Sequence, residues 1–135
     1  MKNFLFTIVL ALLFVNVQAQ EQKHQLSSHI LDISKGMPAS GVTIQLARYH
    51  ETTKSWSIIA EKTTDKNGRI TDFLPAENSN LGVYKLIFHT KPYFATKGLE
   101  SFYPFIEVVF EIKDQNHYHV PITLSAYGYS TYRGN

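Results

Sequence analysis

Apolar and polar residues alternate along most of the chain, in short runs separated by residues that favour turns. Within residues 42–48, for example, Val42, Ile44 and Leu46 occupy every second position, which is the period of a strand with one buried face. The same kind of pattern predicts further strands, some of them short. The five principal strands are 42–48, 56–63, 83–90, 105–113 and 117–124, and the shorter ones are 26–33, 69–73 and 127–132.

This pattern leaves little room for helix. No segment keeps a helical period over several turns, and residues 75–81 have room for one short helix at most. Asp65-Lys66-Asn67-Gly68 is a strong turn sequence between two of the predicted strands. Many short strands at nearly regular spacing predict an all-β domain, either a two-sheet β-sandwich or a barrel.

Residues 1–19 differ from the rest of the chain. Lys2 precedes a nearly unbroken apolar run, and Val17-Gln18-Ala19 places small residues where a signal peptidase cleaves. The run is shorter than the ~20 apolar residues of a membrane span, so we interpret it as a signal peptide, with a retained membrane anchor as the alternative. We therefore expect one mature domain, residues 20–135, that is exported and is either periplasmic or secreted.

The charge of the chain limits which binding partners are expected, and its cysteine content limits how the fold is stabilised. The chain has 13 Lys and Arg against 11 Asp and Glu, and removal of the signal peptide with Lys2 leaves a formal charge of about +1. So balanced a charge does not point to nucleic acid or to an anionic membrane surface as a partner of the mature form. The chain has no cysteine, so the exported domain must fold without disulfides.

The strand predicted at 117–124 carries the first candidate chemistry. Its even-numbered residues are apolar and predict a core face, whereas His117, His119 and Pro121 share the opposite face. We therefore expect His119 to project away from the core, where solvent, a ligand or another subunit can reach it. Pro121 lacks a backbone donor and is typical of an edge strand or a bulge. Two solvated histidines on an outer sheet face are the plainer interpretation, because exposed histidine is common.

The other candidate residues are ordinary when each is taken singly. His29, Arg69 directly after the Asn-Gly turn, and Arg133 near the end of the chain would usually be surface residues. His117 and His119, two apart on one strand, could bind zinc together with His29, but no cysteine is available and no carboxylate is marked as a further ligand. The tyrosines near the end suit either stacking on a planar ligand or packing at a subunit contact; they are Tyr127, Tyr129 and Tyr132.

Three separated blocks of this sequence resemble the transthyretin-like 5-hydroxyisourate hydrolases. They are LSSHILDISKGMPASGVTIQL, which contains His29, TTDKNGRI, which contains Arg69, and HYHVPITLSAYGYSTYRG, which contains His119. The blocks follow the family's order at compatible spacing and together cover essentially the whole predicted domain. The resemblance is therefore specific, although no single block would be.

The resemblance implies a transthyretin-like two-sheet β-sandwich that assembles as a homotetramer, a dimer of dimers, with active sites in clefts where the dimers meet. The implied reaction is hydrolysis of 5-hydroxyisourate, the product of urate oxidation, to 2-oxo-4-hydroxy-4-carboxy-5-ureidoimidazoline. The partner is this small-molecule substrate, and the resemblance implies no metal and no organic cofactor. The implied catalytic residues are His29, Arg69 and His119, and the implied substrate-binding residues are these three with Tyr132, Arg133 and Asn135.

These residue types suit the implied chemistry. His119 or His29 can accept a proton from water near neutral pH, and we hypothesise that one is the base and the other orients it. Arg69 offers a planar pair of donors to a carbonyl or a developing oxyanion. Asn135 departs from the family, whose chains usually end in Ser, because an amide can hold substrate or water but cannot form an alkoxide. We expect activity to be retained with altered turnover.

Two other functions fit the same predicted fold. Transthyretin is a hormone carrier of this fold in which the family's catalytic residues are replaced, and a structural or adhesive sandwich domain would need no site at all. Fold alone does not decide between these functions. The combination of His29, Arg69 and His119 with the YRG ending favours the hydrolase over the carrier.

Overall fold

The computed structural model describes residues 23–135, most of which lie in short strands. The predicted signal peptide, residues 1–19, lies outside the described residues. The predicted strands are confirmed, with ends that differ by at most two residues, and the structure adds the very short β2. In chain order the elements are β1 (His24–Asp32), β2 (Met37–Pro38), β3 (Thr43–His50), β4 (Ser55–Thr63), β5 (Arg69–Pro75), β6 (Gly82–Phe88), α2 (Thr90–Ala95), β7 (Ile106–Ile112), β8 (Tyr118–Ser125) and β9 (Gly128–Thr131).

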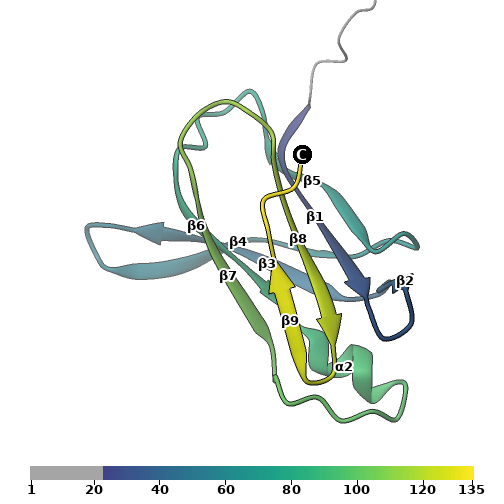
Figure 1. The fold of residues 1–135 in the computed structure, drawn as a ribbon. Helices are drawn as coiled ribbons and strands as arrows, with labels where there is room; N and C mark the ends of the chain where they lie inside the picture. The colour runs from purple at the N-terminus through teal and green to yellow at the C-terminus, as the bar shows by residue number, and fades with distance from the viewer. Residues whose placement is uncertain (1–22) are drawn as a thin grey trace, which may run out of the picture.

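The strands form two sheets (Figure 1), and the apolar faces of these sheets meet in one core. In the first sheet β8 lies between β1 and β9, and the other side of β1 pairs with β5 along most of its length and with β2 at its end. The second sheet has the order β4-β3-β6-β7. Two open sheets packed on each other confirm the predicted sandwich and exclude the closed barrel.

The core follows the alternation that is visible in the sequence. In β8, Tyr118 and Ile122 are buried, and in β6, Leu86 and Phe88 are fully buried. Burying one large apolar side chain stabilises the fold by about 1.5–3 kcal/mol. The core therefore determines which face of β8 points inward, and the face that carries His119 is left pointing outward.

The helix α2 does not lie in residues 75–81, where the sequence allowed for a short helix. Pro75 ends β5 and residues 76–81 form a turn and irregular structure, whereas Thr90, predicted to end the strand 83–90, instead begins α2. The cause is tertiary, because α2 has no side-chain N-cap but buries Phe94 completely in the core. In residues 75–81, the side-chain amide of Asn80 donates to the main-chain carbonyl of the segment's first residue at 2.9 Å and so favours a turn. Within residues 23–135 no helix is long and apolar enough to cross a membrane.

The turn predicted before Arg69 is confirmed, and it places this residue at the start of β5. Oδ1 of Asp65 accepts the backbone N–H groups of Asn67 at 2.8 Å and of Arg69 at 2.9 Å. Gly68 has a φ of +70°, a conformation that favours glycine. A Cβ added to Gly68 would lie 2.6 Å from the backbone oxygen of Ile30 in β1, so the turn is seated directly against that strand.

Replacing Gly68 by Ala is expected to lower the free energy of unfolding by about 1–3 kcal/mol, because the residue would be strained at this φ and its methyl would meet the backbone of Ile30. Gly36 is the matched control, since its φ is +64° but an added Cβ would meet nothing within 4 Å. Gly36→Ala should therefore destabilise less, as measured by urea unfolding. Equal losses in the two variants would show that the close approach to Ile30 is unimportant.

Candidate active site

His29 and Arg69 come from neighbouring strands of the first sheet. The antiparallel pairing of β1 with β5 places them directly across from one another, and directly opposed residues share one face of a sheet. His29 is half-buried, whereas Arg69 is exposed. The imidazole and the guanidinium are therefore held side by side by backbone pairing, with the guanidinium open to a ligand.

His119 reaches the same face from β8. The residue before it, Tyr118, is buried in the core, so the side chain of His119 points the other way, as the sequence predicted. The parallel pairing of β8 with β1 places His119 level with Ser27, two residues before His29. Residues two apart on a strand share a face, so the fold gathers His29, Arg69 and His119 on one outer face of the first sheet.

Pro121 lies within the sheet, although proline is typical of an edge strand. The ladder between β8 and β9 stops at the pair Ile122 and Thr131, so it ends just before Pro121, which has no N–H to donate. The hydroxyl of Thr131 donates to the carbonyl of Pro121 at 2.9 Å. Pairing then resumes as an isolated bridge between His119 and Gly134, so the proline marks an interruption in the ladder.

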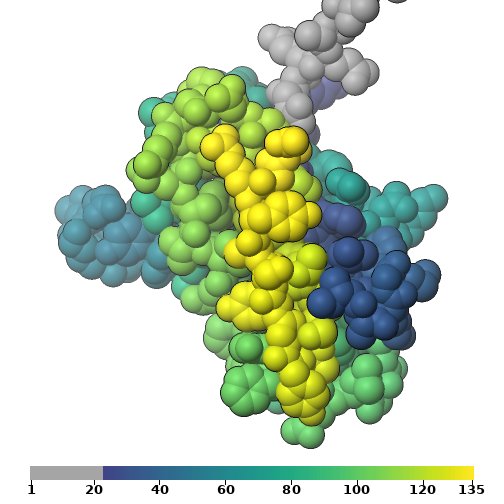
Figure 2. All heavy atoms as spheres, in the orientation of Figure 1, coloured from purple at the N-terminus to yellow at the C-terminus, as the bar shows by residue number. Residues whose placement is uncertain are grey.

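The end of the chain is fastened beside His119. The backbone N–H of Gly134 donates to the carbonyl oxygen of His119 at 2.9 Å, and Figure 2 shows this segment, in yellow, running along the surface of the molecule. A Cβ at position 134 would overlap the imidazole ring of His119. Only glycine therefore allows the tail to run this close to the histidine.

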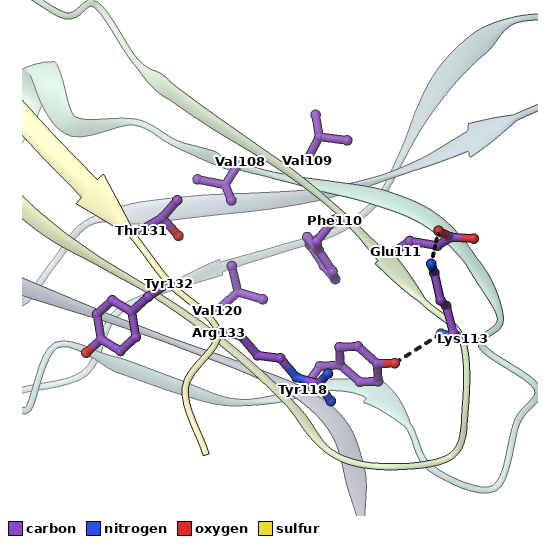
Figure 3. A pocket seen from close by; sticks show the side chains of 10 residues that line it. All are labelled: Val108, Val109, Phe110, Glu111, Lys113, Tyr118, Val120, Thr131, Tyr132 and Arg133. Carbon is purple, nitrogen blue, oxygen red and sulfur yellow. Dashed lines mark hydrogen bonds and ion pairs between the residues drawn. The ribbon is translucent and has the colours of Figure 1, made fainter.

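Not every predicted site residue of the C-terminal segment lies near His29, Arg69 and His119. The guanidinium of Arg133 lies over the ring of Tyr118, with its central carbon 4.7 Å from the ring centroid, on the opposite face of β8 from His119. Arg133 and its neighbour Tyr132 both line a cavity of about 420 Å³ beside β7, and their side chains extend in different directions (Figure 3). Tyr132 is 58% exposed and Asn135 is also exposed. Within one chain, the sheet itself separates Arg133 from the histidines.

Burial and neighbouring positive charge lower the pKa of both histidines. For His29, burial has the largest effect, followed by the Arg69 guanidinium, and a backbone hydrogen bond and a nearby carboxylate oppose these effects only in part. For His119, burial again has the largest effect on the pKa, followed by Arg69 and then by His29 and His117. Both imidazoles are therefore neutral at pH 7, which is the form that accepts a proton.

Sequence reasoning did not single out Ser27, which touches two histidines. Its Oγ lies 2.8 Å from Nε2 of His117 and 2.8 Å from Nδ1 of His119. The available signal was its place two residues before His29, on the same strand face. In residues 23–135 no group of three or more His, Asp or Glu side chains is placed to hold a metal ion.

Comparison with known proteins agrees with this fold and shows the family. Residues 26–134 match the HIUase/Transthyretin family. The chain is 43% identical over 135 residues to a probable 5-hydroxyisourate hydrolase of Caenorhabditis elegans, covering 99% of this chain and 98% of the relative. The structure of this chain is similar to that of Klebsiella pneumoniae 5-hydroxyisourate hydrolase, with a TM-score of 0.70, 40% identity and coverage of 82% of this chain and 98% of the other. It is also similar to sea bream transthyretin in complex with thyroxine, with a TM-score of 0.76, 31% identity and coverage of 82% and 94%. The chain belongs to the HIUase/Transthyretin family.

Proposed function

We propose that this protein hydrolyses 5-hydroxyisourate to 2-oxo-4-hydroxy-4-carboxy-5-ureidoimidazoline, a step of urate degradation. The observation that supports this most is the convergence of His29, Arg69 and His119 on one sheet face from three different strands. Sequence separates these residues widely, and a structural domain would have no need to gather them. The similarity to hydrolases over nearly the whole chain supports the same conclusion.

The gathered residues supply what this ring opening requires. The oxygen of a water molecule bonds to C6 of the substrate, the bond between C6 and N1 breaks, and N1 takes up a proton. A neutral imidazole, that of His119 or His29, accepts the proton that the attacking water loses, and the other imidazole orients the reactants. Arg69 stabilises the negative charge that develops on the oxygen at C6.

The direct test follows the absorbance of 5-hydroxyisourate produced in place from urate by urate oxidase. Addition of the purified protein should make the substrate decay faster than it does spontaneously. Decay at the spontaneous rate would contradict the proposal. Binding of thyroxine would then be measured, because the backbone is also similar to that of a thyroxine-bound transthyretin, and the carrier is the second candidate function.

The activity should survive mild acid. Because the pKa values of His29 and His119 are lowered from the ordinary value of 6.5, the neutral imidazoles persist as the pH falls to 6.5. The kcat/KM value should therefore still exceed half of its plateau at pH 6.5 and reach its half-maximal point only at lower pH, where the base becomes protonated. A pH–rate profile with its half-maximal point above pH 6.5 would contradict the assignment of either histidine as the base.

Asn135 is proposed to contact the substrate in place of the usual serine. Asn135→Ser should change kcat by less than about 100-fold, because an amide and a hydroxyl can each donate and accept one hydrogen bond at this position. The same absorbance assay measures the change. A larger gain in the serine variant would show that a hydroxyl is required and that Asn135 limits the enzyme as it stands.

We also propose that the protein works as a homotetramer, a dimer of dimers in which the face that carries the three residues meets a second copy. That face is the outer side of a sheet, and Arg69 is exposed on it in the single chain. A second subunit would exclude water from the reaction and strengthen the charge interactions there. Sedimentation equilibrium should give the mass of four chains, and a fully active monomer would contradict the proposal.

Export of the protein is proposed from residues 1–19 alone, whose short apolar run is followed by small residues. The mature form should begin at or near Gln20 and be periplasmic or secreted. N-terminal sequencing of the protein recovered from cell fractions checks both points. An N-terminus that still carries Lys2 in a membrane fraction would indicate a retained anchor instead.

A further inference from the structure

A chain of hydrogen bonds runs from His119 back to the main chain of β1. Nδ1 of His119 lies 2.8 Å from Oγ of Ser27, and the same Oγ lies 2.8 Å from Nε2 of His117. Nδ1 of His117 in turn lies 3.0 Å from the carbonyl oxygen of His24. Ser27 is only 8% exposed, so its hydroxyl has little access to water and is committed to these two histidines.

The donor and acceptor in each hydrogen bond of this chain follow from the group at its end, the carbonyl oxygen of His24. The carbonyl of His24 can only accept, so Nδ1 of His117 carries a proton. In neutral His117 the other nitrogen, Nε2, is then bare and accepts the hydroxyl proton of Ser27. A hydroxyl has one proton, so Oγ of Ser27 must accept from Nδ1 of His119. The proton of neutral His119 therefore lies on Nδ1, and its Nε2 keeps a free lone pair.

We propose that Ser27 and His117 are positioning residues that hold His119 as the tautomer with a bare Nε2. The consequence for catalysis rests on the proposed function, in which His119 takes a proton from the attacking water and Nε2 is the atom that takes it. Neither Ser27 nor His117 needs to touch the substrate for this role. Each acts through the ring of His119, as an orienting group acts on a catalytic histidine.

The surroundings of His119 explain why such a device is needed. After burial, the groups that lower its pKa are Arg69 of β5, His29 of β1 and His117, the residue directly before β8, and all three carry positive charge when protonated. Positive charge around His119 favours the neutral ring, but it does not determine which of the two ring nitrogens carries the proton. Hydrogen bonds make that choice here, and they end on a backbone carbonyl, which stays uncharged at every pH.

The opposite arrangement has a distinct and measurable signature. If His117 were doubly protonated, its Nε2 would donate to Ser27, the Ser27 hydroxyl would donate to Nδ1 of His119, and the proton of His119 would move to Nε2. His119 would then have no lone pair on Nε2 and could not accept a proton at that atom. The protonation of one ring nitrogen therefore decides between the two arrangements.

The test is long-range proton–nitrogen NMR of the histidine rings at the pH of the assay, since it distinguishes protonated from bare ring nitrogens. In the wild-type protein, His119 should have a protonated Nδ1 and a bare Nε2. Ser27→Ala should yield a mixture of tautomers and lower kcat/KM by about 10- to 100-fold, the range seen when a partner that orients a metal-bound histidine is lost. Ser27→Thr, which restores a hydroxyl, should recover most of both. His117→Ala should move the proton of His119 toward Nε2, because the Ser27 hydroxyl is then free to donate to Nδ1.

Ser28→Ala is the matched control. Ser28 is the next residue in β1 and is fully buried, and its hydroxyl donates to the carbonyl oxygen of Val120 at 2.8 Å. Its loss removes a comparable hydrogen bond but touches neither histidine, so the tautomer of His119 and kcat/KM should not change. Any general effect of weakening β1 would appear in this variant as well.

Two results would overturn the proposal: a proton on Nε2 of His119 in the wild-type protein, or a tautomer that Ser27→Ala leaves unchanged. Because the NMR measurement needs no substrate, it separates this proposal from the proposed function. A protein that shows the expected tautomer but does not hydrolyse 5-hydroxyisourate would contradict the function alone. An active enzyme with the opposite tautomer would contradict the positioning role alone.

Discussion

Replacing His119 by Ala is expected to lower kcat/KM for 5-hydroxyisourate by about 10²–10⁴-fold, the range for loss of a general base. His119 projects from β8 onto the outer face of the first sheet, and its pKa is lowered by burial and then by Arg69. The neutral ring is therefore available to accept a proton at pH 7. The substrate-decay assay, corrected for the spontaneous rate, measures the loss.

His50→Ala is the control for this substitution. His50 ends β3 in the other sheet and is exposed, and its Nε2 lies 2.6 Å from Oγ of Ser57 in β4, so loss of its side chain should leave the rate unchanged. Thermal unfolding of both variants would show that each is folded. Near wild-type turnover in His119→Ala would rule out this residue as the base and would direct attention to His29.

Gly134→Ala is expected to lower kcat/KM by about 10²-fold, the loss that a displacement of roughly 1 Å can cause at a catalytic group. A methyl at this position would overlap the ring of His119. In addition, the backbone N–H of Gly134 donates a hydrogen bond to the carbonyl oxygen of His119. Either the tail or the imidazole must therefore move. If the ring moves, kcat should fall, and if only the tail moves, KM should rise, so steady-state kinetics distinguish the two responses.

Gly128 offers the matched control for this change. It begins β9, in the same C-terminal segment, and a Cβ there would meet only Oγ of Ser125 at 3.7 Å, an ordinary contact. Gly128→Ala should therefore retain nearly full activity. Similar losses in both glycine variants would mean that the flexibility of the tail, and not its close approach to His119, limits the reaction.

The strands were predictable because their signal is local. In β8 the alternation of apolar and polar residues from Tyr118 to Leu124 both identifies the strand and assigns its faces, since a period of two has only one consistent inward side. The helix was not predictable in this way. Residues 90–95 form the helix α2 because Phe94 packs into the core. This contact is made with distant strands, so the local sequence does not predict it.

The sequence by itself determined the fold class, the outward direction of His119 and, through three blocks that resemble a known family, the identity of the candidate residues. Only the tertiary structure decided which residues meet. His29 lies across from Arg69, and beside the strand of His119, because β1 is paired with β5 on one side and with β8 on the other. The same pairing brings Ser27 between two histidines, and it leaves Arg133 on the opposite face of the sheet. Strand partners and register depend on contacts between distant parts of the chain, so no local pattern of residues can specify them.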